Sequence, residues 1–133
     1  MRIVTTSGKR KTAVARATVR KGAGRVRINN VPLEIVTPEL CRQKMQEALM
    51  MVGAEHTDKI DIDVDVRGGG VMGQADAVRT AISRGIVEFL EDNELKNKLL
   101  AYDRSLIVND TRRKEPKHPQ GRGARKKWQK SYR

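Results

Sequence analysis

Apolar and polar residues alternate most regularly between Lys59 and Arg67. The apolar positions are Ile60, Ile62, Val64 and Val66, and the residues between them are Asp61, Asp63 and Asp65. A period of two predicts a strand with one buried and one solvated face. Such strands are typical of antiparallel or mixed sheets that helices cover on one side only.

The N-terminal part of the chain also has a strand pattern. Residues 12–20 alternate imperfectly, residues 21–24 (Lys-Gly-Ala-Gly) supply a turn, and residues 25–28 resume the alternation. This arrangement predicts a β-hairpin between the two segments. Asn29-Asn30 and Pro32 are expected to end it.

Three later segments have helical spacing. In the first, Thr37 is expected to cap the helix and Pro38 to occupy its first position, and Gly53 ends the apolar run. The glycines at 68–70 break the strand before it, and a long helix is predicted over residues 73–91. Asp92 or Asn93 is expected to cap a third helix, which ends near residue 100 and turns Leu95 and Leu99 inward.

The apolar pattern ends after Leu106-Ile107-Val108. The remaining residues combine Pro, Gly and like charges, which predicts an extended tail without a core of its own. The chain is therefore expected to have the α+β class, with a four-stranded mixed sheet and helices on one face. A globular domain over residues 1–108 is followed by an extended basic tail over residues 109–133.

Charge divides the chain into three parts. Residues 1–27 hold nine Lys or Arg and no acid, and residues 112–133 hold ten against a single Glu. Residues 28–111 between them hold nine bases against fifteen acids. Two basic arms around an acidic centre indicate a polyanionic partner, because Lys and Arg neutralise phosphates. A solvated, disordered tail is the simpler interpretation for one arm, but it does not explain both.

The composition excludes several other classes. No apolar run approaches the roughly 20 residues of a membrane span, and the lone Cys41 cannot form an intrachain disulfide. We therefore expect a cytoplasmic protein that contacts no membrane. The chain has one Cys and two His, which is a poor set for a zinc site, and no catalytic or metal-binding residues and no cofactor are expected.

Two motifs admit a chemical interpretation besides a structural one. The glycines of residues 68–73 have dinucleotide-binding spacing, but a tight turn or an RNA-phosphate contact is favoured, because the preceding strand is wet on one face. Asp61, Asp63 and Asp65 resemble the start of a calcium loop, yet Val66 and Met72 stand where that loop needs Gly and Glu. An exposed strand face beside basic strands, or one facing away from RNA, is preferred.

Several motifs together resemble a known family. They are Gly8-Lys9-Arg10-Lys11-Thr12-Ala13-Val14-Ala15-Arg16-Ala17, Ile28-Asn29, Gly68-Gly69-Gly70 with Gly73-Gln74-Ala75-Asp76-Ala77-Val78-Arg79, and Gly123-Ala124-Arg125 with Gln129-Lys130-Ser131-Tyr132-Arg133. Over essentially the whole chain they are similar to the universal ninth protein of the small ribosomal subunit, and the Ser-Tyr-Arg ending resembles its archaeal and eukaryotic branch.

The resemblance implies a left-handed β-α-β fold in the head of the small subunit, on the 3′ major domain of its rRNA and beside other ribosomal proteins. It also implies that the tail reaches the peptidyl-site tRNA and that the protein is structural and not an enzyme. We predict rRNA contacts for Lys9, Arg10, Lys11, Arg16, Arg79, Arg112, Arg113, Arg122, Arg125, Lys126 and Lys127. The resemblance implies tRNA contacts for Lys130, Ser131, Tyr132 and Arg133.

Two other functions remain open on the sequence alone. A free-standing RNA chaperone or nucleoid-like protein would use the same basic arms, and would bind many RNAs and some duplex DNA with similar affinity. A nucleotide-binding enzyme would use the loop of residues 68–73.

Overall fold

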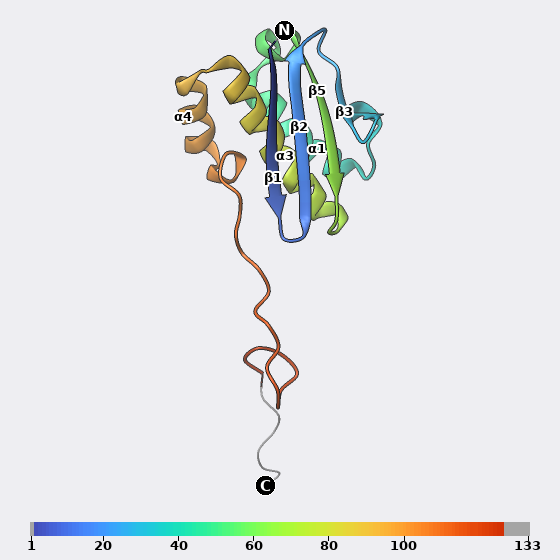
Figure 1. Cartoon of the computed structure of the whole chain (residues 1–133), viewed down its shortest axis with the longest axis vertical. Helices are drawn as coiled ribbons and strands as arrows, with labels where there is room; N and C mark the ends of the chain where they lie inside the picture. Colours follow the sequence, from blue (N-terminus) through green and yellow to red (C-terminus); the bar gives the residue numbers. More distant parts are fainter. Residues whose placement is uncertain (1, 127–133) are drawn as a thin grey trace.

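One mixed sheet forms the centre of the computed structural model, which describes residues 2–126 (Figure 1). Its strands lie in the order β1-β2-β5-β3-β4; β3 and β5 run parallel and the other neighbours are antiparallel. In chain order the elements are β1 (Ile3–Arg10), β2 (Ala13–Lys21), β3 (Val26–Ile28), β4 (Val31–Pro32), the 3-10 helix η1 (Leu33–Ile35), α1 (Glu39–Val52), α2 (Ala54–Thr57), β5 (Ile60–Arg67), α3 (Val71–Leu90), α4 (Asn93–Tyr102) and the 3-10 helix η2 (Arg104–Leu106). The α+β class and the mixed sheet are confirmed.

The sheet has five strands, so the prediction of four was wrong. The additional strand, β4, is two residues long and pairs with the end of β3. Between them the chain reverses through Asn29 and Asn30, whose φ angles are 50° and 66°. Two residues are too few to show an alternating pattern, and Pro32 is compatible with an edge strand only. The sequence therefore indicated the end of a strand where a short hairpin exists.

The predicted hairpin between residues 12–20 and 25–28 was also wrong, because β5 lies between β2 and β3. The Asp61 carboxylate accepts hydrogen bonds from the amides of Ala23 and Arg25 at 2.9 and 3.0 Å, and the Ile62 amide donates to the Arg25 carbonyl at 2.8 Å. The Arg25 and Ala23 amides, together with nearby arginines, lower the pKa of Asp61 against the opposing effect of desolvation. These contacts direct β3 to the far side of β5.

The strand predicted from the alternation is confirmed as β5. Its four apolar residues are buried, as are alternate residues of β2, so only one face of the sheet is covered. On the open face the Asp63 carboxylate lies 3.0 Å from the Arg20 guanidinium and 3.1 Å from that of Arg27. The acidic strand therefore lies between basic ones, as preferred. Within residues 2–126, no group of three or more Asp, Glu, His or Cys side chains is placed to hold a metal ion.

The three long helices lie near their predicted positions, but the start of α1 differs in detail. Pro38, after a cis peptide bond, takes the capping position, and Thr37 makes no capping contact. The Asp92 carboxylate caps α4 by accepting from the amides of Glu94 and Leu95 at 2.9 and 3.2 Å, and Leu95 and Leu99 are buried as predicted. No helix in the described part of the chain combines the length and apolarity needed to cross a membrane.

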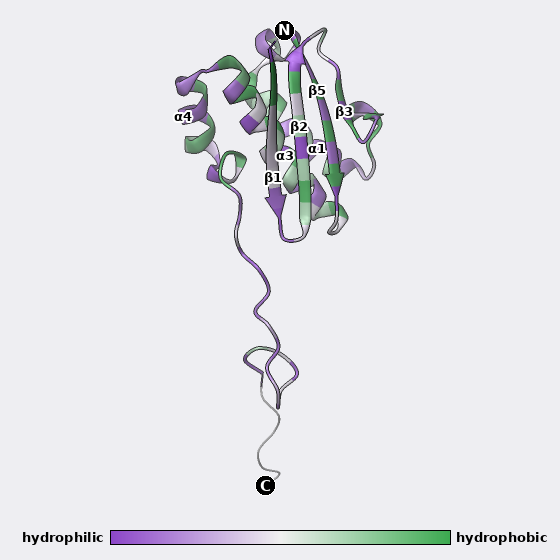
Figure 2. Ribbon diagram, in the orientation of Figure 1, coloured by the Kyte–Doolittle hydropathy of each residue, from purple (hydrophilic) through white to green (hydrophobic). Residues whose placement is uncertain are grey.

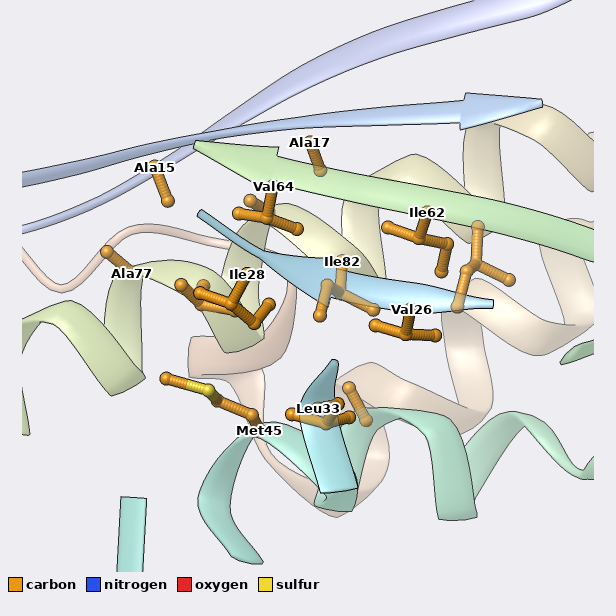
Figure 3. Close-up of a cluster of buried hydrophobic side chains, with 14 of the residues drawn as sticks. Ala15, Ala17, Val26, Ile28, Leu33, Met45, Ile62, Val64, Ala77 and Ile82 are labelled. Carbon is orange, nitrogen blue, oxygen red and sulfur yellow. The ribbon is translucent and has the colours of Figure 1, made fainter. Parts of the chain in front are cut away.

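The core consists of aliphatic side chains, Cys41 and methionine, with Phe89 only partly buried against it. Figure 3 shows side chains from β2, β3, β5, α1 and α3 gathered in one cluster, with Ile82 of α3 beside those of the strands. In Figure 2 the apolar residues follow the strands and helices, and the segment after η2 is mainly hydrophilic. Burial of this apolar surface is the main term that stabilises the domain.

α3 approaches β1 closely because small residues meet at their contact. A Cβ atom added at Gly8 would lie 2.7 Å from the amide nitrogen of Ala81, and closer still to the carbonyl oxygen of Ala77. One added at Gly85 would lie 2.7 Å from Cγ2 of Val19. The backbones of α3 and β1 are therefore in contact at Gly8, while Gly85 lets α3 approach the Val19 side chain of β2. A larger side chain at either glycine would force the helix away from the sheet.

Arg79 of α3 joins α1 to the segment before η2. Its guanidinium lies 2.7 Å from the Glu47 carboxylate and 3.1 Å from that of Asp103, and it donates to the Ser105 hydroxyl at 2.6 Å. Burial alone would lower the pKa of Arg79, but the two carboxylates outweigh it and raise that pKa. Burial would likewise raise the pKa of Asp103, yet hydrogen bonds from Ser105 and Arg79 lower it. One tenth of the Arg79 side chain is exposed, so it acts inside the fold.

We predict opposite effects for alanine at two glycines. Gly8→Ala should lower the free energy of unfolding by about 2 kcal/mol or more, because overpacking against α3 leaves no room for a methyl group. Gly73 lies in α3, and a Cβ atom added there would lie 3.6 Å from the Arg10 carbonyl oxygen, an ordinary contact distance. Gly73→Ala should therefore be neutral or stabilising by up to about 1 kcal/mol. Urea unfolding of the purified variants measures both. Equal effects would contradict the close packing of α3 on β1.

We also predict that Arg79→Met lowers the free energy of unfolding by about 1–3 kcal/mol, since Glu47 and Asp103 lose their partner while partly exposed to water. Arg79→Lys should recover part of the loss, because it keeps the charge but cannot fork between two carboxylates. Thermal unfolding provides the measurement. RNA affinity of the folded variants should stay unchanged; reduced affinity with unchanged stability would contradict a structural role.

Candidate RNA interface

Three consecutive basic residues, Lys9, Arg10 and Lys11, lie where β1 turns into β2; they are called the basic turn below. The reversal is tight, since Arg10 pairs with Ala13 and the φ angle of Lys11 is 54°. Lys9 and Lys11 are exposed, and Arg10 is half-buried. The end of this hairpin therefore presents adjacent positive charges to solvent.

The glycine-rich segment between β5 and α3 packs against the basic turn. Gly68 and Gly69 have φ angles of 78° and 67°, and a Cβ atom at Gly68 would lie 2.6 Å from the carbonyl oxygen of Thr12. Only glycine combines this backbone conformation with so close an approach. The tight turn favoured from the sequence thus accounts for the spacing. In addition, β5 has an antiparallel neighbour, unlike the strand that precedes a dinucleotide site.

The chain returns to the basic turn after η2, through residues 107–112, which are called the tail root below. The side-chain oxygen of Asn109 accepts from the Lys9 amide at 3.1 Å, and Asp110 forms a parallel β-bridge with Arg10. Arg10 also donates to the carbonyl oxygen of Arg112 at 3.1 Å. The two basic arms recognised in the sequence therefore meet at one end of the sheet, where the tail leaves the domain (Figure 1).

Asp110 holds these cations together. Its carboxylate accepts hydrogen bonds from Nε of Arg112, at 3.0 Å to each oxygen, and from the Arg112 Nη2 at 2.7 Å, and lies 3.8 Å from Arg10 Nε. The Arg112 side chain and amide lower the pKa of Asp110 far below its usual value, so this carboxyl is ionised at neutral pH. A cavity of about 320 Å³ opens beside it, and Lys9 and Lys44 also line it. Cations outnumber acids in this cavity, which suits an anion.

Sequence reasoning missed Arg84, which holds the tail root in place. From α3 its guanidinium donates to the carbonyl oxygen of Ser7 at 2.9 Å, and also to that of Ile107. It thereby joins β1 to the segment that follows η2. The only signal was an arginine on the mostly apolar helix that also holds Arg79, and it does not reveal which carbonyl groups Arg84 would meet.

Beyond the root, residues 113–118 run extended and exposed, and residues 119–126 then turn back in a loop in which Gly121 is buried and the Arg122 amide donates to the Lys126 carbonyl at 3.2 Å (Figure 1). Five residues assigned to rRNA are exposed, one at the end of the root and four beyond it: Arg112, Arg113, Arg122, Arg125 and Lys126. Arg125 pairs with Glu115 at 2.8 Å, and this hydrogen-bonded arginine lowers the pKa of Glu115. An extended chain with spaced cations can follow a phosphate backbone.

The remaining assigned residues lie elsewhere. Arg16 is exposed on the open face of β2, opposite Asp65 of β5, and away from the basic turn. Arg79 is buried in its ion-pair cluster, so its assignment to rRNA is corrected: both carboxylates already occupy its guanidinium. Lys127 and the residues assigned to tRNA lie outside the described residues; these are Lys130, Ser131, Tyr132 and Arg133.

Comparison with known proteins gives a consistent result. The profile of the family described as ribosomal protein S9/S16 matches residues 8–133. The proteins named small ribosomal subunit protein uS9 from Methanothrix thermoacetophila and Thermoplasma volcanium are 59% and 60% identical to the chain, over the full length of each. The protein of the same name from Halobacterium salinarum is 56% identical over 98% of this chain and 99% of its own. A profile match over nearly the whole chain and identity above half leave one assignment: the chain belongs to the ribosomal protein S9/S16 family.

Proposed function

We propose that the chain is a structural constituent of the small ribosomal subunit in the cytoplasm, and that its basic end binds rRNA of the 3′ major domain in the head. The observation that carries this proposal is the meeting of the basic turn and the tail root at one end of the sheet. Membership of the family supports the ribosomal location. The protein braces folded RNA in this role, and no bond is made or broken.

The contacts at this end are with phosphates. Lys9, Lys11 and Arg113 are exposed there, and long cationic side chains neutralise phosphates without reading bases. The rRNA-binding set that we propose is Lys9, Arg10, Lys11, Arg16, Arg112, Arg113, Arg122, Arg125, Lys126 and Lys127. In this arrangement residues 1–108 form the globular RNA-binding domain and residues 109–133 its tail, and the β3–α1–β5 connection has the left-handed sense of the family.

The tail is proposed to reach the peptidyl-site tRNA, with Lys130, Ser131, Tyr132 and Arg133 in contact with it. These four residues lie outside the described part, so the support comes from the root and from the family resemblance. A fully extended segment of the length of residues 109–133 spans about 80 Å at most. That reach allows the end of the tail to meet a ligand far from the RNA bound by the basic turn.

We predict that the salt dependence of RNA binding identifies the basic turn. The double variant Lys9→Gln, Lys11→Asn should make fewer phosphate contacts, so its binding releases fewer counterions. The slope of log affinity against log salt should therefore become less steep by about 1 for each residue changed. Asn tolerates the positive φ angle at position 11. The measurement is binding of the purified protein to a 3′ major-domain rRNA fragment over a series of KCl concentrations.

The matched control, Lys21→Gln with Lys59→Gln, also removes two positive charges, but at the opposite end of the sheet. The two lysines are close there, because Lys21 pairs with Ile60, the residue after Lys59. This control should leave the slope unchanged. Equal slopes for the two double variants would remove the basic turn from the interface. Equal affinity of the native protein for unrelated duplex DNA would favour the chaperone function instead.

We further predict that deletion of Arg133 weakens tRNA retention while assembly stays nearly intact. Loss of one charge-assisted contact should raise the Kd of peptidyl-site tRNA about 3- to 10-fold. Filter binding of tRNA to programmed small subunits measures this, and sedimentation reports incorporation of the protein. Lys117→Gln removes one tail charge near the root and serves as the control. Unchanged tRNA affinity in the deletion variant would overturn the proposed tail contact.

A further inference from the structure

β1 is an edge strand whose outer backbone groups are only partly used. Its even-numbered residues face β2, and the odd-numbered residues Ile3, Thr5, Ser7 and Lys9 direct their N–H and C=O groups away from the sheet. The Ser7 carbonyl and the Lys9 amide are bonded to Arg84 and Asn109. No hydrogen bond from residues 2–126 reaches the outward groups of Thr5.

The chain itself covers the C-terminal half of this edge. Asp110 bridges Arg10 in parallel orientation, and Arg84 holds Ile107 beside Ser7. The chain therefore already lies beside the C-terminal end of β1 at Asn109 and Asp110, and Ile107, in the turn after η2, is tied to Ser7 through Arg84. The N-terminal half of the same edge has the same geometry but lacks an occupant from the described residues.

A groove of about 920 Å³ runs along this open half. β1 forms one wall through residues 5–7, and the C-terminal part of α3 and the start of α4 form the other. Val87 and Ile107 contribute apolar surface, while Asn93 and Lys96 contribute polar groups. Its volume lies within the range of pockets that hold ligands.

The charge of the groove is mixed with a positive excess. Four cationic and two acidic side chains line it: Arg2, Arg16, Arg84 and Lys96 against Glu88 and Glu91. Arg2 is paired with Glu91 at 2.8 Å, and Arg84 is bonded to carbonyl groups. Among the described residues, Arg16, Arg84 and Lys96 have no carboxylate partner, and Glu88 is the one acid of the groove without a cationic partner, so the remaining charge of the groove is positive and attracts an anion.

We propose that this groove receives an extended acidic segment of a neighbouring protein of the small subunit, which adds to β1 as a further strand. This goes beyond the RNA contacts proposed above and lies apart from the basic turn. The alternating donors and acceptors of Thr5 match a peptide backbone, whereas phosphates only accept hydrogen bonds. The apolar surface of Val87 and Ile107 likewise favours a peptide over RNA.

Hydrogen exchange in purified small subunits tests the added strand. Val4 and Thr6 face β2, so their amides should exchange slowly both in the free protein and in the subunit. The Thr5 amide should exchange fast in the free protein and at least tenfold more slowly in the subunit, since it gains a partner there. Equal Thr5 exchange in both states would overturn the proposal.

Zero-length carbodiimide cross-linking in the same subunits identifies the occupant. Lys96 should join to an Asp or Glu of another protein, and Lys96→Glu should reduce Thr5 protection at least threefold. Lys98→Glu is the matched control, because Lys98 contacts the carbonyl oxygen of Met51 on another side of α4 and does not line the groove. The proposal that a peptide occupies the groove would be overturned if Lys96 formed no cross-link to another protein. It would also be overturned if ultraviolet light cross-linked the groove to rRNA.

Failure here is distinguishable from failure of the proposed RNA contacts. The salt slope of the Lys9 and Lys11 variant and the tRNA affinity of the Arg133 deletion report on the other end of β1 and on the tail. Neither measurement involves Lys96 or Thr5.

Discussion

The close approach of α3 to β1 at Gly8 is the constraint on which the rest of the structure depends. Because no side chain separates the two elements, Arg84 of α3 reaches both the Ser7 carbonyl in β1 and the Ile107 carbonyl beyond η2. That bridge places the tail root beside the end of β1. The two basic arms, which are a hundred residues apart in sequence, thereby become neighbours. A helix displaced by a few tenths of an ångström would lose this registry, since packed interiors yield little.

Acidic residues in this fold hold cationic side chains in position and also neutralise their charge. Asp63 occupies Arg20 and Arg27 on the open face of the sheet, and Glu47 and Asp103 occupy Arg79 inside the domain. These pairs remove positive charge from the sheet face and the interior. At the basic turn and along the tail the cations outnumber the acids, since Asp110 and Glu115 are the only carboxylates that pair with them among the described residues. This distribution of charge directs a polyanion to the end of the molecule that holds the basic turn and the tail root.

Local patterns were predictable from the sequence, and long-range partners were not. The alternation in β5 and the cap at Asp92 were recognised because each depends on residues within one element. The neighbour of β3 was misjudged because it depends on Asp61, which bonds the Arg25 amide from 36 positions away. Arg79 carried the same charge as the surface arginines, and nothing local indicated that Glu47 and Asp103 would enclose it. The ninth-protein family was recognisable because its motifs are specific in combination, although the meeting of its two basic arms is visible only in three dimensions.

Because the tail is anchored at its root, its end needs less affinity of its own for a ligand. On the proposed function, the domain binds rRNA through the basic turn, and the tail root is tied to that turn by Asn109 and Asp110. Contact between the end of the tail and tRNA is then intramolecular within the subunit, with an effective concentration set by the length of the tail. A few weak contacts suffice under these conditions, so a short basic ending can stabilise bound tRNA and still release it. On this proposal, a loosened root would lengthen the free segment and lower the effective concentration of its end, so Asp110 would contribute to tRNA holding without touching tRNA.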